Sequence, residues 1–135
     1  MPTINYLTRI EFDFEAISGL GAEIERMGLK RPFLVTDRGI ADAGILQRAI
    51  DAAAPSRPVV YDRTTENPKE QSLLECLEIW SAHGCDGVIA LGGGSPIDLV
   101  KAVALLTSHG GKLEDYNVKT GGSAGIGKVS PQIAI

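Results

Sequence analysis

The stretch Gly87-Val-Ile-Ala-Leu-Gly-Gly-Gly-Ser-Pro-Ile-Asp-Leu-Val-Lys101 organises this chain. Its apolar run over 88–91 predicts a short buried strand, and the glycines at 92–94 predict a tight turn without side chains. Ser95 is a preferred helix N-cap, and Pro96 suits the first helical position. Asp98 follows Ser95 at the spacing of a capping box. The stretch therefore predicts a strand, a glycine turn and a helix capped at Ser95.

Such a turn presents backbone N–H groups at a helix N-terminus, which is a favourable place for phosphate. Glycine allows a pyrophosphate to approach the backbone closely, because it has no Cβ. The pattern is not a P-loop, since Lys101 lies too far into the helix. It is not the ordinary Rossmann fingerprint either, since Ile97 stands at the third glycine position. A plain strand-to-helix turn without a ligand is the alternative.

Length and composition limit the classes of function. A chain of 135 residues suits one domain, and 44% hydrophobic with 22% charged residues is typical of a globular protein. A net charge of −4 without a basic cluster argues against nucleic acid or an anionic membrane as the main partner. No apolar run approaches the ~20 residues of a membrane span. With no signal-peptide pattern and no metal-type spacing of Cys76 and Cys85, a cytoplasmic protein with free thiols is expected.

The rest of the chain alternates between short apolar runs and helical patterns. Strands are predicted at 7–14, 32–36, 58–61, 88–91 and 132–135, and helices at 16–27, 45–53, 69–83 and 95 to about 109. A helical turn is expected at 113–116 and a flexible glycine-rich loop at 121–128. Connections of about 10–20 residues imply parallel strands with right-handed crossovers. The expected fold is α/β, a Rossmann-like parallel sheet with helices on both faces.

Ligands of such sheets bind beyond the carboxyl ends of the strands. Asp37 directly follows a predicted strand, where its carboxylate either accepts hydrogen bonds from an adenosine ribose or caps the next turn. Asp62 has the same position on the next strand, and there the capping role is favoured. Asn67 precedes a proline and either caps its loop or reaches a ligand. Lys101 is favoured as an i,i+3 partner of Asp98.

Three segments together resemble a known family. Val35-Thr-Asp-Arg-Gly39, Asn67-Pro68 and above all Gly92-Gly-Gly-Ser-Pro-Ile-Asp-Leu-Val-Lys101 are similar to the N-terminal domain of the iron-containing (group III) alcohol dehydrogenases. The similarity runs from about residue 29 to residue 135. The opening residues depart from the family, which often has Phe-Gly where this chain has Phe12-Asp13.

The resemblance implies that residues 1–135 form a dinucleotide-binding domain. The glycine run and Ser95 would hold the pyrophosphate of NAD, and Asp37 would face the adenosine ribose. Asn67 would line the cofactor cleft, and Asp98 would lie toward the nicotinamide half. The implied cofactor-binding residues are Asp37, Asn67, Gly92, Gly93, Gly94, Ser95 and Asp98. The implied cofactor is NAD, with NADP as an option.

The resemblance also implies an activity and its limits. The family transfers a hydride reversibly between an alcohol and NAD(P), while a divalent iron or zinc ion polarises the substrate oxygen. The family's metal ligands lie in a C-terminal all-helical domain, which this chain is predicted to lack. This chain alone is therefore expected to hold no catalytic residue and no metal, and to be inactive. A final core-like strand without a polar tail independently predicts a truncated protein. The expected partner is a small alcohol or aldehyde, and a homo-oligomer remains an open option.

Two other functions stay open at this point. One is a stand-alone nucleotide- or phosphate-binding module without chemistry of its own. The other is an enzyme similar to dehydroquinate synthase or glycerol dehydrogenase, within the same superfamily. The spacing Ser95-x-x-Asp98-x-x-Lys101 favours the alcohol dehydrogenase branch.

Overall fold

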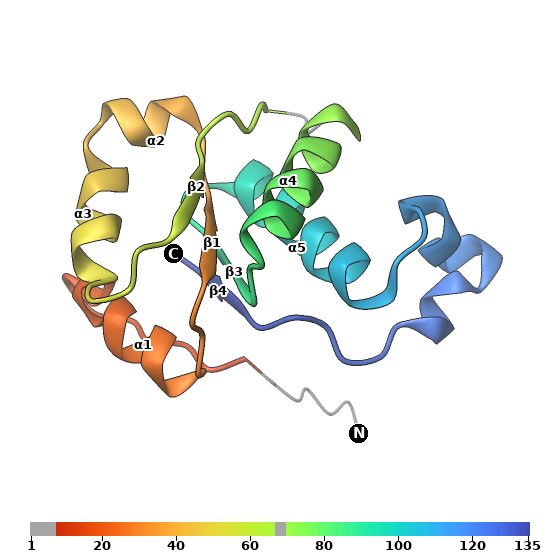
Figure 1. The fold of residues 1–135 in the computed structure, drawn as a ribbon, viewed down its shortest axis with the longest axis horizontal. Coiled ribbons are helices and arrows are strands. Elements are labelled where there is room, and N and C mark those ends of the chain that lie inside the picture. The colour runs from red at the N-terminus through yellow and green to blue at the C-terminus, as the bar shows by residue number, and fades with distance from the viewer. Residues whose placement is uncertain (1–7, 67–69) are drawn as a thin grey trace, which may run out of the picture.

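The computed structural model describes residues 8–66 and 70–135. Its centre is a four-stranded sheet with the strand order β2-β1-β3-β4, and all neighbouring pairs are parallel (Figure 1). The strands are β1 (Pro32–Val35), β2 (Val59–Tyr61), β3 (Gly87–Ala90) and β4 (Gln132–Ala134). In the middle of the sheet, Leu34 of β1 is in register with Val60 on one side and Ile89 on the other.

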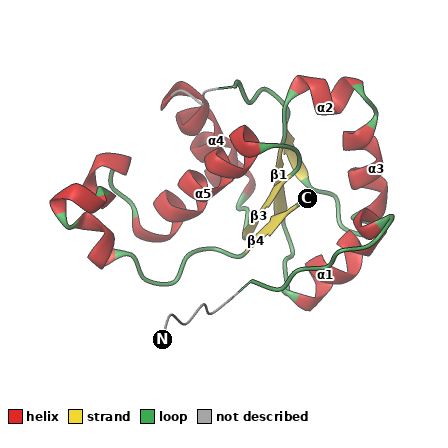
Figure 2. Ribbon diagram, turned by 180° about the vertical axis from the view of Figure 1, so that it is seen from behind, coloured by secondary structure: helices red, strands yellow, loops and turns green. Residues whose placement is uncertain are grey.

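Helices cover both faces of this sheet. One side carries α1 (Leu20–Arg26), α2 (Arg38–Asp42) and α3 (Ile45–Ala52), and the other carries α4 (Glu70–His83) and α5 (Gly94–His109), as Figure 2 shows from behind. Short 3-10 turns lie at Ala16–Gly19, Leu113–Tyr116, Val118–Thr120 and Gly122–Gly125. The predicted α/β fold, a Rossmann-like parallel sheet with helices on both faces, is confirmed.

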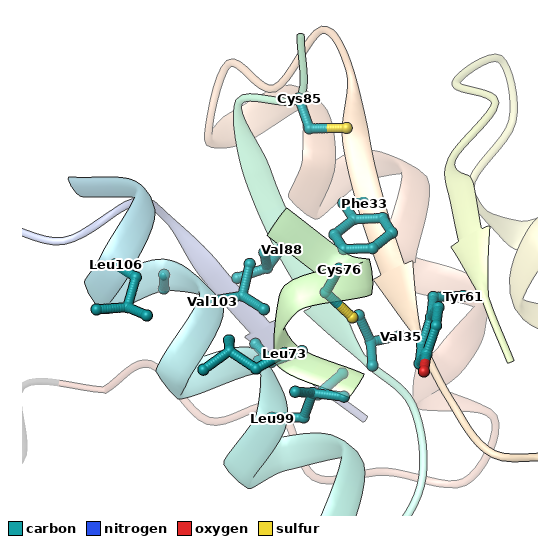
Figure 3. Close-up of a cluster of buried hydrophobic side chains, with 13 residues drawn as sticks. Phe33, Val35, Tyr61, Leu73, Cys76, Cys85, Val88, Leu99, Val103 and Leu106 are labelled. Carbon is teal, nitrogen blue, oxygen red and sulfur yellow. The ribbon is translucent and has the colours of Figure 1, made fainter. Parts of the chain in front are cut away.

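Two hydrophobic clusters fill the space between the sheet and its helices. Successive strand side chains point to opposite faces, so each inner strand contributes to both clusters. Phe33, Val35 and Val88 pack toward α4 and α5 (Figure 3). Leu34 and Ile89 pack toward α1 and α3. Strands β1 and β3 are buried along their whole length, which explains why they read as unbroken apolar runs.

Both cysteines belong to the cluster beneath α4 and α5. Cys76 and Cys85 are buried free thiols, as expected from the sequence. Burial raises the pKa of Cys76 to about 12 and also raises the pKa of Cys85. The thiolate is the form that reacts and binds metals, so these two groups act as packing residues at neutral pH.

The structure differs from the predicted elements at three places. Residues 8–14 form no strand, although 7–14 was predicted as one. Phe12 and Phe14 are 99% and 97% exposed, so their alternation does not mark a buried face. Helix α2 was not predicted, because its five residues are too few to show a helical period. The glycine-rich loop at 121–128 is not uniformly irregular, since it contains the 3-10 turn Gly122–Gly125.

Gly21 allows α1 to pack closely against the end of α3. A Cβ at this position would lie 2.8 Å from the carbonyl oxygens of both Ala52 and Ala54. We expect Gly21→Ala to lower the free energy of unfolding by about 1–3 kcal/mol, because overpacking forces the backbone to shift. Urea unfolding measures this change. Gly125→Ala is the control, since its Cβ would meet nothing within 4 Å; equal unfolding midpoints for the two variants would contradict the close packing.

Candidate functional site

The carboxyl ends of β1, β2 and β3 lie at the same edge of the sheet, and the chain leaves them in different directions. After β1 it enters α2 on one face, whereas after β2 and β3 it enters α4 and α5 on the other face (Figure 1). This divergence at β1 is a topological switch point, the place where open α/β sheets bind ligands.

Thr36 joins the three strand ends. Its backbone N–H donates to the carbonyl oxygen of Tyr61 at 2.8 Å, and its hydroxyl Oγ1 donates to the carbonyl oxygen of Leu91 at 2.7 Å. The carbonyl oxygen of Thr36 accepts from the N–H of Thr64 at 3.2 Å. The hydroxyl of Thr64 is buried, and among the described residues it has no hydrogen-bond partner. The strand ends therefore form a rigid edge that also contains one unpaired polar atom.

The start of α5 differs from its prediction. The helix begins at Gly94, and its N-cap is Gly93 rather than Ser95. The hydroxyl of Ser95 instead donates to the carbonyl oxygen of Glu66 at 2.7 Å, which ties the loop after β2 to the first turn of α5. The predicted capping box with Asp98 is therefore wrong, because Ser95 already lies inside the helix.

The three glycines of the turn differ in backbone conformation and in what surrounds them. Gly92 has a φ of +129°, which side chains rarely allow, and its Cβ would lie 3.3 Å from Cγ1 of Ile40. Gly93 and Gly94 have no positive φ, and a Cβ at either position would meet nothing within 4 Å. The fold thus explains the first glycine, while the other two leave open space beside bare backbone.

The first turn of α5 supplies hydrogen-bond donors beside that space. The N–H groups of Gly94 and Ser95 precede the first intrahelical bond, which Ile97 donates to the carbonyl oxygen of Gly93 at 3.4 Å. Pro96 has no N–H, so the third helical position leaves no unpaired donor. Free N–H groups and the positive end of a helix dipole favour an anion. Together with the open space at Gly93 and Gly94, they fit the pyrophosphate of a dinucleotide.

Asp37 stands opposite the glycine turn. Its Oδ1 accepts the N–H of Ile40 at 2.9 Å, so Asp37 is the N-cap of α2. Its Oδ2 lies 3.6 Å from the position that a Cβ of Gly92 would take. The capping role weighed from the sequence is confirmed, and the same half-buried carboxylate also faces the turn. The contact with a ribose stays a prediction.

Sequence reasoning did not foresee an ion pair that links the ends of β1 and β2. Nη1 of Arg38 lies 2.8 Å from Oδ2 of Asp62, so Asp62 pairs with a cation rather than capping its turn. Beside this pair, the hydroxyl of Tyr61 donates to Glu75 at 3.1 Å, and Nη2 of Arg63 lies 3.3 Å from the same carboxylate. A signal was present in the sequence, since an Asp-Arg dipeptide follows both strands, at 37–38 and 62–63.

Two of the predicted cofactor-binding residues remain, Asn67 and Asp98. Asn67 is outside the described residues. Asp98 lies in the second turn of α5 with its side chain 71% exposed, and its Oδ1 is 3.6 Å from Nζ of Lys101. The favoured i,i+3 pairing of Lys101 is thus confirmed. The residues that the structure brings together at the strand ends are Asp37, Gly92, Gly93, Gly94 and Ser95.

Other parts of the described chain offer no competing site of comparable chemistry. A cavity of ≈ 540 Å³ lies between residues 8–13, the first helical turns and β4, and its lining is mainly apolar. The lining of this cavity does not include the N–H donors of α5, so we place the candidate site at the strand ends. Within residues 8–66 and 70–135, no group of three or more His, Cys, Asp or Glu side chains could hold a metal ion. None of the described helices is long and apolar enough to cross a membrane.

A parallel sheet with a glycine turn at its switch point is the architecture of Rossmann-like nucleotide-binding proteins. A family model described as "Iron-containing alcohol dehydrogenase" matches residues 8–135. The chain therefore belongs to the iron-containing alcohol dehydrogenase family, as the resemblance at Gly92–Lys101 implied.

Individual relatives agree with this family. The 4-hydroxybutyrate dehydrogenase of Cupriavidus necator is 47% identical over 136 residues, which cover all of this chain and 36% of that protein. The crystal structure of sulfoacetaldehyde reductase from Bifidobacterium kashiwanohense in complex with NAD+ matches with a TM-score of 0.74 at 30% identity, over 89% of this chain and 31% of its own. The NADH-dependent butanol dehydrogenase A of Thermotoga maritima shares the fold, with a TM-score of 0.83 at 22% identity over 99% of this chain and 34% of its own. The chain thus spans about a third of the length of these relatives.

Proposed function

We propose that this chain is the NAD-binding domain, residues 1–135, of a metal-dependent alcohol dehydrogenase. The observation that carries the proposal is the open space at Gly93 and Gly94 beside the free N–H groups of α5. Glycine at these positions has no packing reason, but it suits a pyrophosphate that lies against the backbone. The NAD+ complex of the sulfoacetaldehyde reductase, which is 30% identical, supports NAD as the cofactor.

In the proposed site, the predicted residues contact different parts of the cofactor. Gly93, Gly94 and Ser95 bind the pyrophosphate with backbone N–H groups, while Gly92 gives the turn its shape. Asp37 accepts hydrogen bonds from the hydroxyls of the adenosine ribose. Asp98 lies toward the nicotinamide half, and Asn67 lines the cleft. In this arrangement the chain binds and orients the cofactor, and no residue of it is assigned a catalytic role.

The whole enzyme would oxidise an alcohol or reduce the matching aldehyde. NAD accepts a hydride from the alcohol carbon, or NADH returns one to the aldehyde carbon. Iron is the metal that the family name supplies, and the described residues hold no group of three or more His, Cys, Asp or Glu side chains that could bind it. The relative from Cupriavidus necator suggests a short hydroxy acid as the first substrate to test. A cytoplasmic location fits this activity and forms part of the proposal.

Titration of the 135-residue chain with NAD tests the proposal. We expect a dissociation constant from the high-micromolar range to about the mM end of the affinity scale, because one domain removes little ligand surface from water. ADP-ribose should compete with NAD, since it carries both the pyrophosphate and the adenosine ribose. Calorimetry measures both. The absence of any binding at millimolar NAD would overturn the proposal, and nanomolar binding would contradict a site formed by this domain alone.

A further inference from the structure

Arg38 is the cation placed next to the proposed ribose position. It directly follows Asp37 and is the first residue of α2. A guanidinium offers several donors in a fixed plane and binds phosphate strongly, often through two parallel hydrogen bonds. A free arginine at this place would therefore favour NADP, which carries a phosphate on the 2′-oxygen of the adenosine ribose.

Arg38 is not free in this structure. Its Nη1 lies 2.8 Å from Oδ2 of Asp62, at the end of the neighbouring strand β2. The side chain of Asp62 is 27% exposed, whereas that of Arg38 is 64% exposed, so the carboxylate is the more fixed partner. The segment that carries Asp62 is itself held by Tyr61, which bonds to Glu75, and by Thr64, which bonds to Thr36.

We infer that Asp62 makes this site select NAD over NADP, by holding the guanidinium of Arg38 in an ion pair. The inference rests on the proposed NAD site. A 2′-phosphate would have to take Arg38 away from Asp62 and leave the Asp62 carboxylate unpaired close by. Asp62 is thus a positioning residue that acts through Arg38, and it adds to the direct repulsion by Asp37.

The pair is weak enough for one substitution to release Arg38. Exposed ion pairs contribute little to stability, so Asp62→Asn should leave the fold intact. Asparagine keeps the size and the polar contacts of the side chain but loses its charge. We expect Asp62→Asn to tighten NADP binding up to about 5-fold relative to NAD, since a released arginine gains a charge-assisted contact with the phosphate and no longer has to leave Asp62. Asp37 stays in place, so a shift in the ratio is expected rather than a reversal.

Calorimetric titrations of the chain with NAD and with NADP test this inference in four variants. Asp62→Asn should raise the relative affinity for NADP, and Arg38→Ala in the same chain should remove the gain. Arg38→Ala alone should change NADP binding less than about 2-fold, because Arg38 is already occupied. Glu78→Gln, which neutralises an exposed carboxylate on α4, is the matched charge control and should change neither constant.

The outcomes separate this inference from the proposed function. An unchanged ratio in Asp62→Asn overturns the inference, and so does a gain that persists when Arg38 is alanine, since Asp62 would then act on the phosphate by its own charge. A large loss of NADP binding in Arg38→Ala alone overturns it as well, because Arg38 would already be free. In these cases NAD binding by the parent chain still supports the proposed function. If the parent chain binds neither cofactor, both proposals fail.

Discussion

Gly93→Val is expected to abolish measurable NAD binding while the protein stays folded. A Cβ at Gly93 would meet nothing within 4 Å and the φ of −82° is not left-handed, so we expect the larger side chain to cost some stability, through the ψ of −156° at the edge of the extended region, without unfolding the protein. A ligand that lies against this backbone does not tolerate the larger side chain, because the branched side chain takes the place of the phosphate. Loss of two hydrogen bonds to a charged group costs about 3 kcal/mol or more, which is roughly a hundredfold in the dissociation constant.

Substitutions at two other glycines are the controls for this experiment. Gly92→Ala should lower stability, because Gly92 has a φ of +129° and a Cβ there would crowd Ile40 at 3.3 Å. Gly125→Ala should change neither stability nor binding, since its Cβ would point into open space far along the chain from α5. Circular dichroism and NAD titration separate the three cases. If a folded Gly93→Val protein bound NAD as tightly as the parent, the glycine run would be only a turn.

Local patterns in the sequence predict the sheet well, because β1 and β3 are buried along their whole length. Strands buried on both faces need unbroken apolar runs, and helices between them need a repeating apolar face, so both leave a visible signal. The prediction of a strand at residues 7–14 was wrong, because an alternation of apolar and polar residues does not by itself provide a neighbouring strand for pairing. The exposure of Phe12 and Phe14 shows that no described residue covers these two side chains.

The candidate site is predictable in part for a similar reason. Glycines 92–94 are adjacent in sequence, so their chemistry can be read directly. The contact of Ser95 with the carbonyl oxygen of Glu66 joins residues 29 positions apart, and the pair of Arg38 with Asp62 joins two strand ends. Such contacts depend on which strands are neighbours in the sheet, and no local sequence pattern predicts the order of the strands. The predicted start of α5 was wrong for the same reason. The hydroxyl of Ser95 donates to the loop after β2 instead of capping its own helix.

Asp37→Gly is expected to relax or reverse a preference of the enzyme for NAD over NADP. In the proposed site, the carboxylate of Asp37 accepts the 2′- and 3′-hydroxyl protons of the adenosine ribose. NADP places a phosphate at the same point, and two anions about 4 Å apart near a protein surface repel by up to about 4 kcal/mol. Even a third of that energy corresponds to roughly a tenfold preference. Arg38 offsets little of this repulsion in the parent, because Asp62 holds it at 2.8 Å.

The N-cap role of Asp37 requires a second variant. Asp37 accepts the N–H of Ile40 at 2.9 Å, so its loss weakens α2 as well as changing the charge. Asp37→Ser removes the charge but keeps an oxygen that can cap the helix, since serine and aspartate are comparable N-caps. If charge decides the preference, Asp37→Ser should shift the ratio of kcat/KM for NAD and NADP in the same direction as Asp37→Gly, roughly tenfold or more. The assay requires an active enzyme that contains this chain, with both cofactors measured before and after each substitution. Equal use of the two cofactors by the parent, or an unchanged ratio in both variants, would remove Asp37 from the cofactor site and leave it only as the cap of α2.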